Sequence, residues 1–262
     1  MLGLKKRILL SFTVFAMFFG AGNLIFPPYL AYEAGRSVLP AFIGFIATAI
    51  GLPVLSLIAI GKASATEKLA SRVHPVFDAA FTIAIYLAIG PCLAIPRTAS
   101  TSYEMVANAL PVKIDWLLIP YSIIFFILSG IIALRPEKLT KRLGRILSPL
   151  LVTLIAILFI GSMLHFSGSG SEAAGAYATH PFSTGFTDGY QTMDALAGLV
   201  FGIVLALNIE ALGVKGKDIT KESVIASIGG AVLLLAVYSM IVVIGLSAKG
   251  YTADAANGAD VL

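Results

Sequence analysis

The run FFGAGNLIFPP, residues 18–28, places two glycines, one asparagine and two consecutive prolines inside an apolar stretch. Pro27 and Pro28 lack the N–H groups that would bond the carbonyls of Asn23 and Leu24, so both carbonyls are predicted to be released. In hydrocarbon, such an interruption is tolerated only where protein or a water-filled cavity receives the freed backbone groups. The run therefore predicts a membrane-spanning helix that is broken into two halves.

A helix broken in this way offers ligands for both signs of charge. The first N–H groups of one half favour an anion such as a carboxylate, whereas freed carbonyls favour a cation or an ammonium group. The side-chain oxygen of Asn23 is a neutral ligand that suits a hard cation. We therefore predict substrate contacts at Gly20, Ala21, Gly22 and Asn23. The alternative is that the glycines allow close helix packing and the prolines mark the end of the span, and it stays open.

A second candidate for a helix break with substrate contacts lies between Gly198 and Gly202, which enclose Val200 and Phe201. This GxxxG spacing is the ordinary signature of tight contact between helices, and the same glycines also permit unwinding. From the spacing alone, packing is the favoured interpretation.

The third candidate is an apolar stretch that holds Pro91 and Pro96, which are predicted to kink its helix. Tyr86 precedes the kink, and its phenol can reach a substrate carboxylate at the centre of a bundle or pack as an ordinary aromatic. Arg97 and Glu104 are expected at the outer interface, where they can form a salt bridge or a gate.

The elements that must position these residues are membrane helices. Of the 262 residues, 58% are hydrophobic and 12% are charged, and the mean hydropathy is +0.94, which leaves too little polar surface for a soluble globule. We expect an all-α membrane protein. Seven stretches approach the ~20 apolar residues that a spanning helix needs. They are residues 8–31, 38–60, 77–98, 116–134, 146–165, 189–212 and 223–247.

Basic residues orient the array, because Lys and Arg are retained in short cytoplasmic loops. With the N-terminus inside, the inner segments hold most of the 18 basic residues: Lys5, Lys6, Arg7, Lys62, Lys68, Arg72, Arg135, Lys138, Lys141, Arg142, Arg145, Lys215, Lys217 and Lys221. The loop from Ser167 to Asp188 has none and is expected outside. The pI near 9.1 therefore reflects topology and anionic lipid, and we expect no nucleic-acid partner.

The acidic residues bear on the transported ion. Asp78, Asp194 and Glu210 are all predicted to fall near the ends of spans, and Asp194 is interpreted as a helix N-terminal charge rather than a ligand. A neutral midplane favours Na⁺ held by carbonyls, amides and hydroxyls over a titrating carboxylate. It also suits a zwitterion with an aliphatic side chain, for which an apolar lining is expected from Phe18, Phe19, Ile25 and Phe201.

An enzyme would need a reacting constellation, and the sequence contains none. There is no HExxH motif and no pair of midplane aspartates, and His74, His165 and His180 all fall near or in loops. We expect neither catalytic activity nor a cofactor. A channel remains a rival, although it would not need two broken helices around an occluded substrate.

Three segments together carry a family resemblance: FFGAGNLIFPP at 18–28, GPCLAIPRTASTSYE at 90–104 and DALAGLVFGIVLALNIEALG at 194–213. They resemble the branched-chain amino acid:cation symporters of bacteria, the LIVCS or BrnQ-like family. That family is similar to LeuT-like, APC-type transporters with two inverted five-helix repeats. Its members have about twelve spans, so the chain resembles an N-terminal fragment. The resemblance implies a first repeat at 1–165, an extracellular loop at 166–188 and an incomplete second repeat at 189–262.

The inverted order also follows from counting, because a five-span unit has an odd number of crossings and its copy must enter from the opposite side. The resemblance implies that the first and sixth helices unwind around the substrate, the sixth at Val200, Phe201 and Gly202. It also implies a Na⁺ site at the carbonyls of Ala16 and Phe19, near Asn23, with its other ligands from an eighth helix beyond this chain.

The function implied is secondary transport of Leu, Ile or Val, coupled to Na⁺ or H⁺, by alternating access in the bacterial inner membrane. The partners expected are the amino acid, Na⁺ and the lipid bilayer. The alternatives are an inactive or partner-dependent transporter fragment, a channel and, least favoured, a membrane-embedded enzyme.

Overall fold

The computed structural model describes residues 2–63, 70–71, 73–108, 115–134, 146–164, 171–249, 255 and 257–262, and every regular element in these ranges is helical. Several residues used in the charge argument, among them Lys68, Arg72 and the basic residues from 135 to 145, lie outside the described residues, as does His165. The expectation of an all-α protein is confirmed.

Among the described residues, four helical segments are long and apolar enough to cross a membrane: Ala21–Gly61, Pro75–Asn108, Asp194–Ala211 and Asp218–Ala248. Two shorter apolar helices, α8 (Leu118–Ala133) and α10 (Ser148–Leu164), accompany them. These spans are those of a multi-pass membrane protein. The number of seven spans and the inverted-repeat architecture stay predictions.

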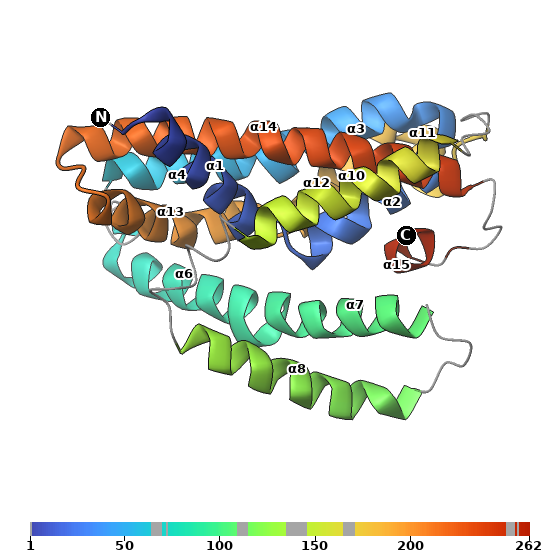
Figure 1. The fold of residues 1–262 in the computed structure, drawn as a ribbon, viewed down its shortest axis with the longest axis horizontal. Coiled ribbons are helices and arrows are strands. Elements are labelled where there is room, and N and C mark those ends of the chain that lie inside the picture. The colour runs from blue at the N-terminus through green and yellow to red at the C-terminus, as the bar shows by residue number, and fades with distance from the viewer. Residues whose placement is uncertain are drawn as a thin grey trace.

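The first broken helix lies along one continuous helix. α1 (Leu4–Phe18) and α2 (Ala21–Ala34) both pack on α14 (Lys217–Ala248), which runs the length of the molecule in Figure 1. Ser11 of α1 lies against Gly229 and Pro28 of α2 lies against Gly245, at positions where any added Cβ would overlap them. Small residues on α14 therefore let α1 and α2 pack close to its backbone, and both run in the same direction as α14.

A second broken helix repeats this arrangement. α3 (Val38–Ile46), the π-helical turn η2 (Ala47–Gly51) and α4 (Leu52–Ala63) follow one another without a break. α12 (Pro181–Gln191) packs on α3, and α13 (Asp194–Ala211) packs on α4, so these two halves lie end to end along the segment from residue 38 to residue 63.

Glycines set this second contact. Gly185 and Gly189 of α12 face the backbone of α3, and the hydroxyl of Thr48 donates to the carbonyl of Phe186 at 2.8 Å. On α13, Gly198 meets Ser56, and a Cβ on Gly202 would lie 2.6 Å from the Cβ of Ile60. The packing interpretation of the GxxxG spacing therefore holds, and the unwinding expected at Val200, Phe201 and Gly202 was wrong, because α13 is helical throughout.

A kinked helix forms a separate layer with α8, below α13 in Figure 1. α6 (Pro75–Leu87) continues into the π-helical segment η3 (Ala88–Cys92) and then α7 (Ala94–Asn108), with non-helical angles at Gly90. Pro91 cannot donate a backbone hydrogen bond, which explains the kink here. The kink predicted from Pro91 is confirmed, whereas Pro96 lies in the first turn of α7, where no kink is found.

The remaining elements are short: η1 (Gly35–Ser37), η4 (Asp115–Leu117), α11 (Gly175–Thr179) and α15 (Gly258–Val261). The core surrounds α14, where Tyr238 is fully buried and its ring lies 5.4 Å from the ring of Phe45.

The break in the first helix is not where the prolines predicted it. Pro27 and Pro28 lie inside α2, and Phe26 is helical, since membrane helices tolerate proline where neighbouring protein accommodates it. The chain leaves the helix instead at Phe19 and Gly20, both of which have extended angles.

Candidate functional site

The break between α1 and α2 is held open by one side chain. Gly20 N–H donates to Oδ1 of Asn23 at 3.0 Å, whereas in a continuous helix it would bond the carbonyl of Ala16. The last carbonyls of α1 therefore have no helical donor, and the N–H groups of Ala21 to Asn23 have no helical acceptor. The predicted freeing of backbone groups is thus found one turn before the prolines.

The break between α12 and α13 falls at Thr192 and Met193. Among the described residues, Met193 is the one non-glycine residue with a positive φ, at 65°. Such a left-handed conformation costs of order 1–3 kcal/mol outside glycine. It separates α12 from α13, which both pack on the continuous helical segment from residue 38 to residue 63. Asp194 is the first residue of α13 and is 4% exposed.

Asn23 joins the two breaks. Its Nδ2 donates to the carboxylate of Asp194 and, at 2.5 Å, to the hydroxyl of Tyr238 on α14. Asn23 itself is 1% exposed. Because a buried amide is costly without partners, this network fixes the first turn of α2 against the first residue of α13.

Arg97 enters the same region from α7. Its Nη1 donates to the carbonyl of Gln191 at 2.9 Å and its Nη2 to that of Thr192 at 3.4 Å, so it bonds carbonyls at the C-terminal end of α12. Its guanidinium lies 5.7 Å from the ring centroid of Phe26. In the part of the chain that the structure describes, Arg97 and Glu104 form no salt bridge, which was one of the two roles expected of them. The other role, a gate, stays a prediction.

A cavity of about 190 Å³ lies among these three interruptions. The α1–α2 break, the α12–α13 break and the α6–α7 kink all contribute to it. Its lining consists of Met17, Phe18, Gly20, Ala21, Gly22, Asn23, Ile89, Ala94, Ile95, Arg97, Thr98, Thr192, Met193, Asp194, Ala197 and Phe201. Arg97 and Asp194 are the charged members of this set.

The structure brings together five of the eight substrate-binding residues predicted from the sequence, namely Gly20, Ala21, Gly22, Asn23 and Phe201. The other three do not line the cavity. Val200 is not among the lining residues, Gly202 contacts Ile60, and Tyr86 is 55% exposed on α6.

Of the cation candidates, Ala16 and Phe19 lie at the α1–α2 break, and the Asn23 oxygen already accepts a bond from Gly20 N–H. Asp194 is the first residue of α13 and of the span Asp194–Ala211, as the sequence predicted, but it is buried beside the break between α12 and α13. The preference for Na⁺ stays a prediction. Most of the polar segment PFSTGFTDGYQ falls in the loop expected at 166–188, but it forms the helix α12.

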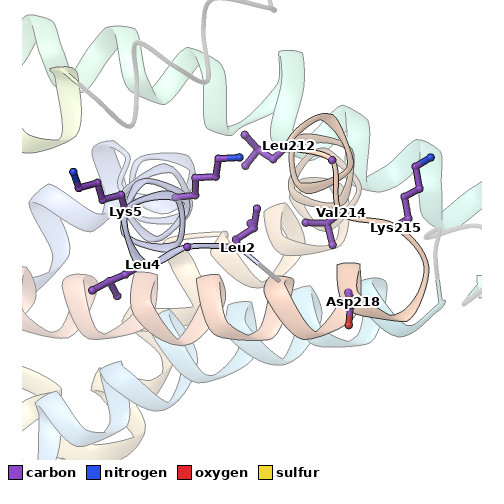
Figure 2. Close-up of a pocket in the computed structure, with 10 residues that line it drawn as sticks. Leu2, Leu4, Lys5, Leu212, Val214, Lys215 and Asp218 are labelled. Carbon is purple, nitrogen blue, oxygen red and sulfur yellow. The ribbon is translucent and has the colours of Figure 1, made fainter.

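A second cavity, of about 730 Å³, lies where the start of α1 meets the turn between α13 and α14. Figure 2 shows Leu2 between these elements, with Lys5 on one side and Lys215 on the other. These lysines were predicted to share the cytoplasmic side, and the structure places them at one end of the molecule. It also shows that α1 leaves the end at which α13 arrives, so the two broken helices run in opposite directions.

The chain is similar to known transport proteins. The family model described as branched-chain amino acid transport protein matches residues 4–262. Branched-chain amino acid permease BraB of Bacillus subtilis is 37% identical over 267 residues, which cover 100% of this chain and 60% of BraB. The branched-chain amino acid transport system 3 carrier protein of Pseudomonas aeruginosa is 40% identical over 99% of this chain and 60% of its own length.

Branched-chain amino acid permease BrnQ of Bacillus subtilis is 38% identical over 97% of this chain and 59% of its own length. The chain thus spans about 60% of the length of these curated relatives. No solved structure matches it significantly. The relatives are transport proteins, which agrees with the expectation that the chain is not an enzyme.

Proposed function

Because the chain belongs to the family of branched-chain amino acid transport proteins, we propose that it takes part in secondary transport of Leu, Ile or Val across the bacterial inner membrane. The amino acid binds in the cavity between the two helix breaks. The observation that carries this proposal is the link from Asn23 to Asp194, which joins the breaks at the cavity wall.

The chemistry of the cavity suits a zwitterion with an aliphatic side chain. N–H groups at the start of α2 favour a carboxylate, and an apolar side chain has Phe18, Ile95 and Phe201 as neighbours. The rings of Phe18 and Phe201 lie 5.6 Å apart and close one wall. Each CH₂ buried there is worth about 0.8 kcal/mol.

Alternating access follows from the arrangement of the halves. α1 and α13 lie toward one end of α14, while α2 and α12 lie toward the other (Figure 1). Each half is anchored on a continuous helix, so movement of the halves at one end exposes the cavity to that side without disturbing the other. The end toward which α1 and α13 lie holds the N-terminus and the lysines near it, and it is the cytoplasmic end.

The coupling ion is Na⁺ or H⁺. The carbonyls of Ala16 and Phe19, which the break frees from helical bonds, support a Na⁺ site beside Asn23. The buried carboxylate of Asp194 lines the same cavity, so a proton carried by this group is the alternative to Na⁺.

Uptake of labelled leucine into liposomes that contain the purified chain tests the proposal. Saturable uptake driven by an inward Na⁺ or H⁺ gradient is expected, and equal uptake with and without a Na⁺ gradient would exclude Na⁺ coupling. Saturable binding without uptake would indicate a partner-dependent fragment, and uptake that does not saturate would indicate a channel.

A further inference from the structure

The cavity between the helix breaks holds one side chain of each charge. Asp194 is 4% exposed, and the hydrogen bonds it accepts come from neutral groups, the amide of Asn23 and the hydroxyl of Thr192. Arg97 donates to two backbone carbonyls, and its Nε is buried without a hydrogen-bond partner. Within the described part of the chain, ion pairing in direct contact is limited to Arg7 and Glu222, so Arg97 and Asp194 attract each other only across the cavity.

This arrangement is costly for the protein alone. A charge taken out of water needs a partner of opposite sign, and one buried without such a partner destabilises the fold. Two unlike charges that line one cavity, and are not paired with each other, complement a ligand that carries both charges in the reverse order. An α-amino acid is such a ligand.

We propose that Asp194 binds the ammonium group of the transported amino acid and that Arg97 binds its carboxylate, so that this pair selects zwitterions. The inference rests on the proposed transport function and names the groups that recognise its substrate. It differs from the recognition expected from the sequence, in which backbone carbonyls alone received the ammonium group.

The backbone beside Arg97 supports this assignment. A Cβ placed on Gly22 would lie 2.7 Å from Nη2 of Arg97, so the guanidinium lies directly over the first turn of α2. A carboxylate bound there meets both a cationic fork and free N–H groups, which is the strong form of hydrogen bonding. The aliphatic side chain then points toward Phe18 and Phe201, which line the same cavity.

The test uses three ligands of similar shape and different charge. Leucine carries both groups, 4-methylpentanoate lacks the ammonium group, and 3-methylbutylamine lacks the carboxylate. Binding of each is measured by titration calorimetry to the chain in lipid nanodiscs. The unchanged protein is expected to bind leucine and neither analogue.

Two substitutions should change this selectivity in opposite directions. Asp194→Asn removes the negative charge and keeps the shape, so leucine affinity should fall by about tenfold or more, while 4-methylpentanoate becomes a ligand. Arg97→Gln should weaken leucine similarly and admit 3-methylbutylamine instead. Glu104→Gln, which neutralises a carboxylate on the same helix as Arg97 but outside the cavity, should leave all three titrations unchanged.

The outcomes separate this proposal from the proposed function. If the unchanged chain does not bind leucine, the transport site itself is contradicted. If leucine binds to the unchanged chain but both variants lose all ligands equally, the zwitterion pair is wrong and Asp194 serves the fold. If Asp194→Asn keeps its leucine affinity and loses only a Na⁺ dependence, the pair is also wrong and Asp194 serves the ion. Melting curves of both variants in nanodiscs distinguish misfolding from altered selectivity. Arg97→Lys is a further control, because it keeps the positive charge and should continue to reject 3-methylbutylamine.

Discussion

Arg7 of α1 holds Glu222 of α14 through two hydrogen bonds of 2.8 Å, one from Nε and one from Nη2. The backbone N–H of Leu2 donates to the same carboxylate at 3.0 Å, and Glu222 is 1% exposed. The first turn of α1 is therefore tied to the continuous helix at the end where the lysines gather. This half-helix is the one that must move if the cavity is to open toward that end.

Loss of this ion pair should open that end. In a background with Cys92→Ser, which removes the single cysteine, Met17→Cys places a thiol on the cavity wall. Arg7→Gln should raise the rate at which a water-soluble reagent labels this thiol several-fold, because α1 is no longer fixed. The rate is measured in nanodiscs. Lys5→Gln removes a neighbouring charge outside the ion pair and should have no effect, and an equal rise in both would refute a specific tie.

Asn23→Ala should destabilise the junction of the two breaks. The substitution leaves Gly20 N–H, the Asp194 carboxylate and the Tyr238 hydroxyl without their shared partner, and each unsatisfied buried group costs about 1–3 kcal/mol. A lower melting temperature in nanodiscs and a weaker dependence of leucine binding on the cation are expected. Tyr238→Phe removes the hydroxyl alone and should cost less, so a larger loss in that variant would contradict the central role of Asn23.

Gly202→Ala should separate α13 from α4. The new methyl group would lie 2.6 Å from the Cβ of Ile60, and overpacking of this kind costs about 1–3 kcal/mol. Gly130→Ala on α8 is the matched control, because no atom lies within 4 Å of its Cβ position. Thermal unfolding should show a loss for Gly202→Ala and no loss for Gly130→Ala. Equal stability would instead favour the unwound segment that the family resemblance implied.

Tyr86→Phe should leave leucine binding unchanged. The sequence suggested that this phenol reaches a substrate carboxylate, but the side chain is 55% exposed and lies outside the cavity lining. Thr98, two turns beyond the kink, does line the cavity, so Thr98→Val is the informative comparison. Calorimetry on both variants decides the question, and a marked loss of affinity in Tyr86→Phe would restore the original interpretation.

The sequence predicted the helices and residues of the site better than their arrangement in space. Glycine spacing and composition sufficed to predict membrane helices, the broken first helix and the GxxxG contact of Gly198 and Gly202. They misplaced the first break, because Pro27 and Pro28 are local signals, whereas the break at Gly20 depends on a hydrogen bond from Gly20 N–H to the side chain of Asn23 and on packing against α14.

The second break and its charges could not be read from local patterns. α12 is too polar to resemble half of a span, and its burial depends on glycines that match α3, which lies more than a hundred residues earlier. Asp194 begins α13, as the sequence predicted, but its burial beside Asn23 depends on contacts between distant segments. Arg97 was likewise misplaced, since only the direction of the kink at Gly90 brings it to the cavity.

The close approach of Gly22 to Arg97 gives a test that couples the two helices. In Gly22→Ala the new Cβ would lie 2.7 Å from Nη2 of Arg97 and 3.3 Å from the Cα of Thr192. The guanidinium can move but the backbone cannot, so Arg97 should leave the carbonyls of Gln191 and Thr192, with a loss of leucine affinity of about tenfold.

A double-mutant cycle isolates this contact. Arg97→Ala removes the obstacle, so Gly22→Ala should cost far less stability in that background than in the unchanged protein, and the two effects on melting temperature should not add. Gly20→Ala is the matched control, because its nearest neighbour lies at 3.7 Å, an ordinary contact, and its effect should be the same in both backgrounds. Additive effects of Gly22→Ala and Arg97→Ala would mean that α7 does not touch the first turn of α2, and the route by which Arg97 reaches a bound carboxylate would be lost.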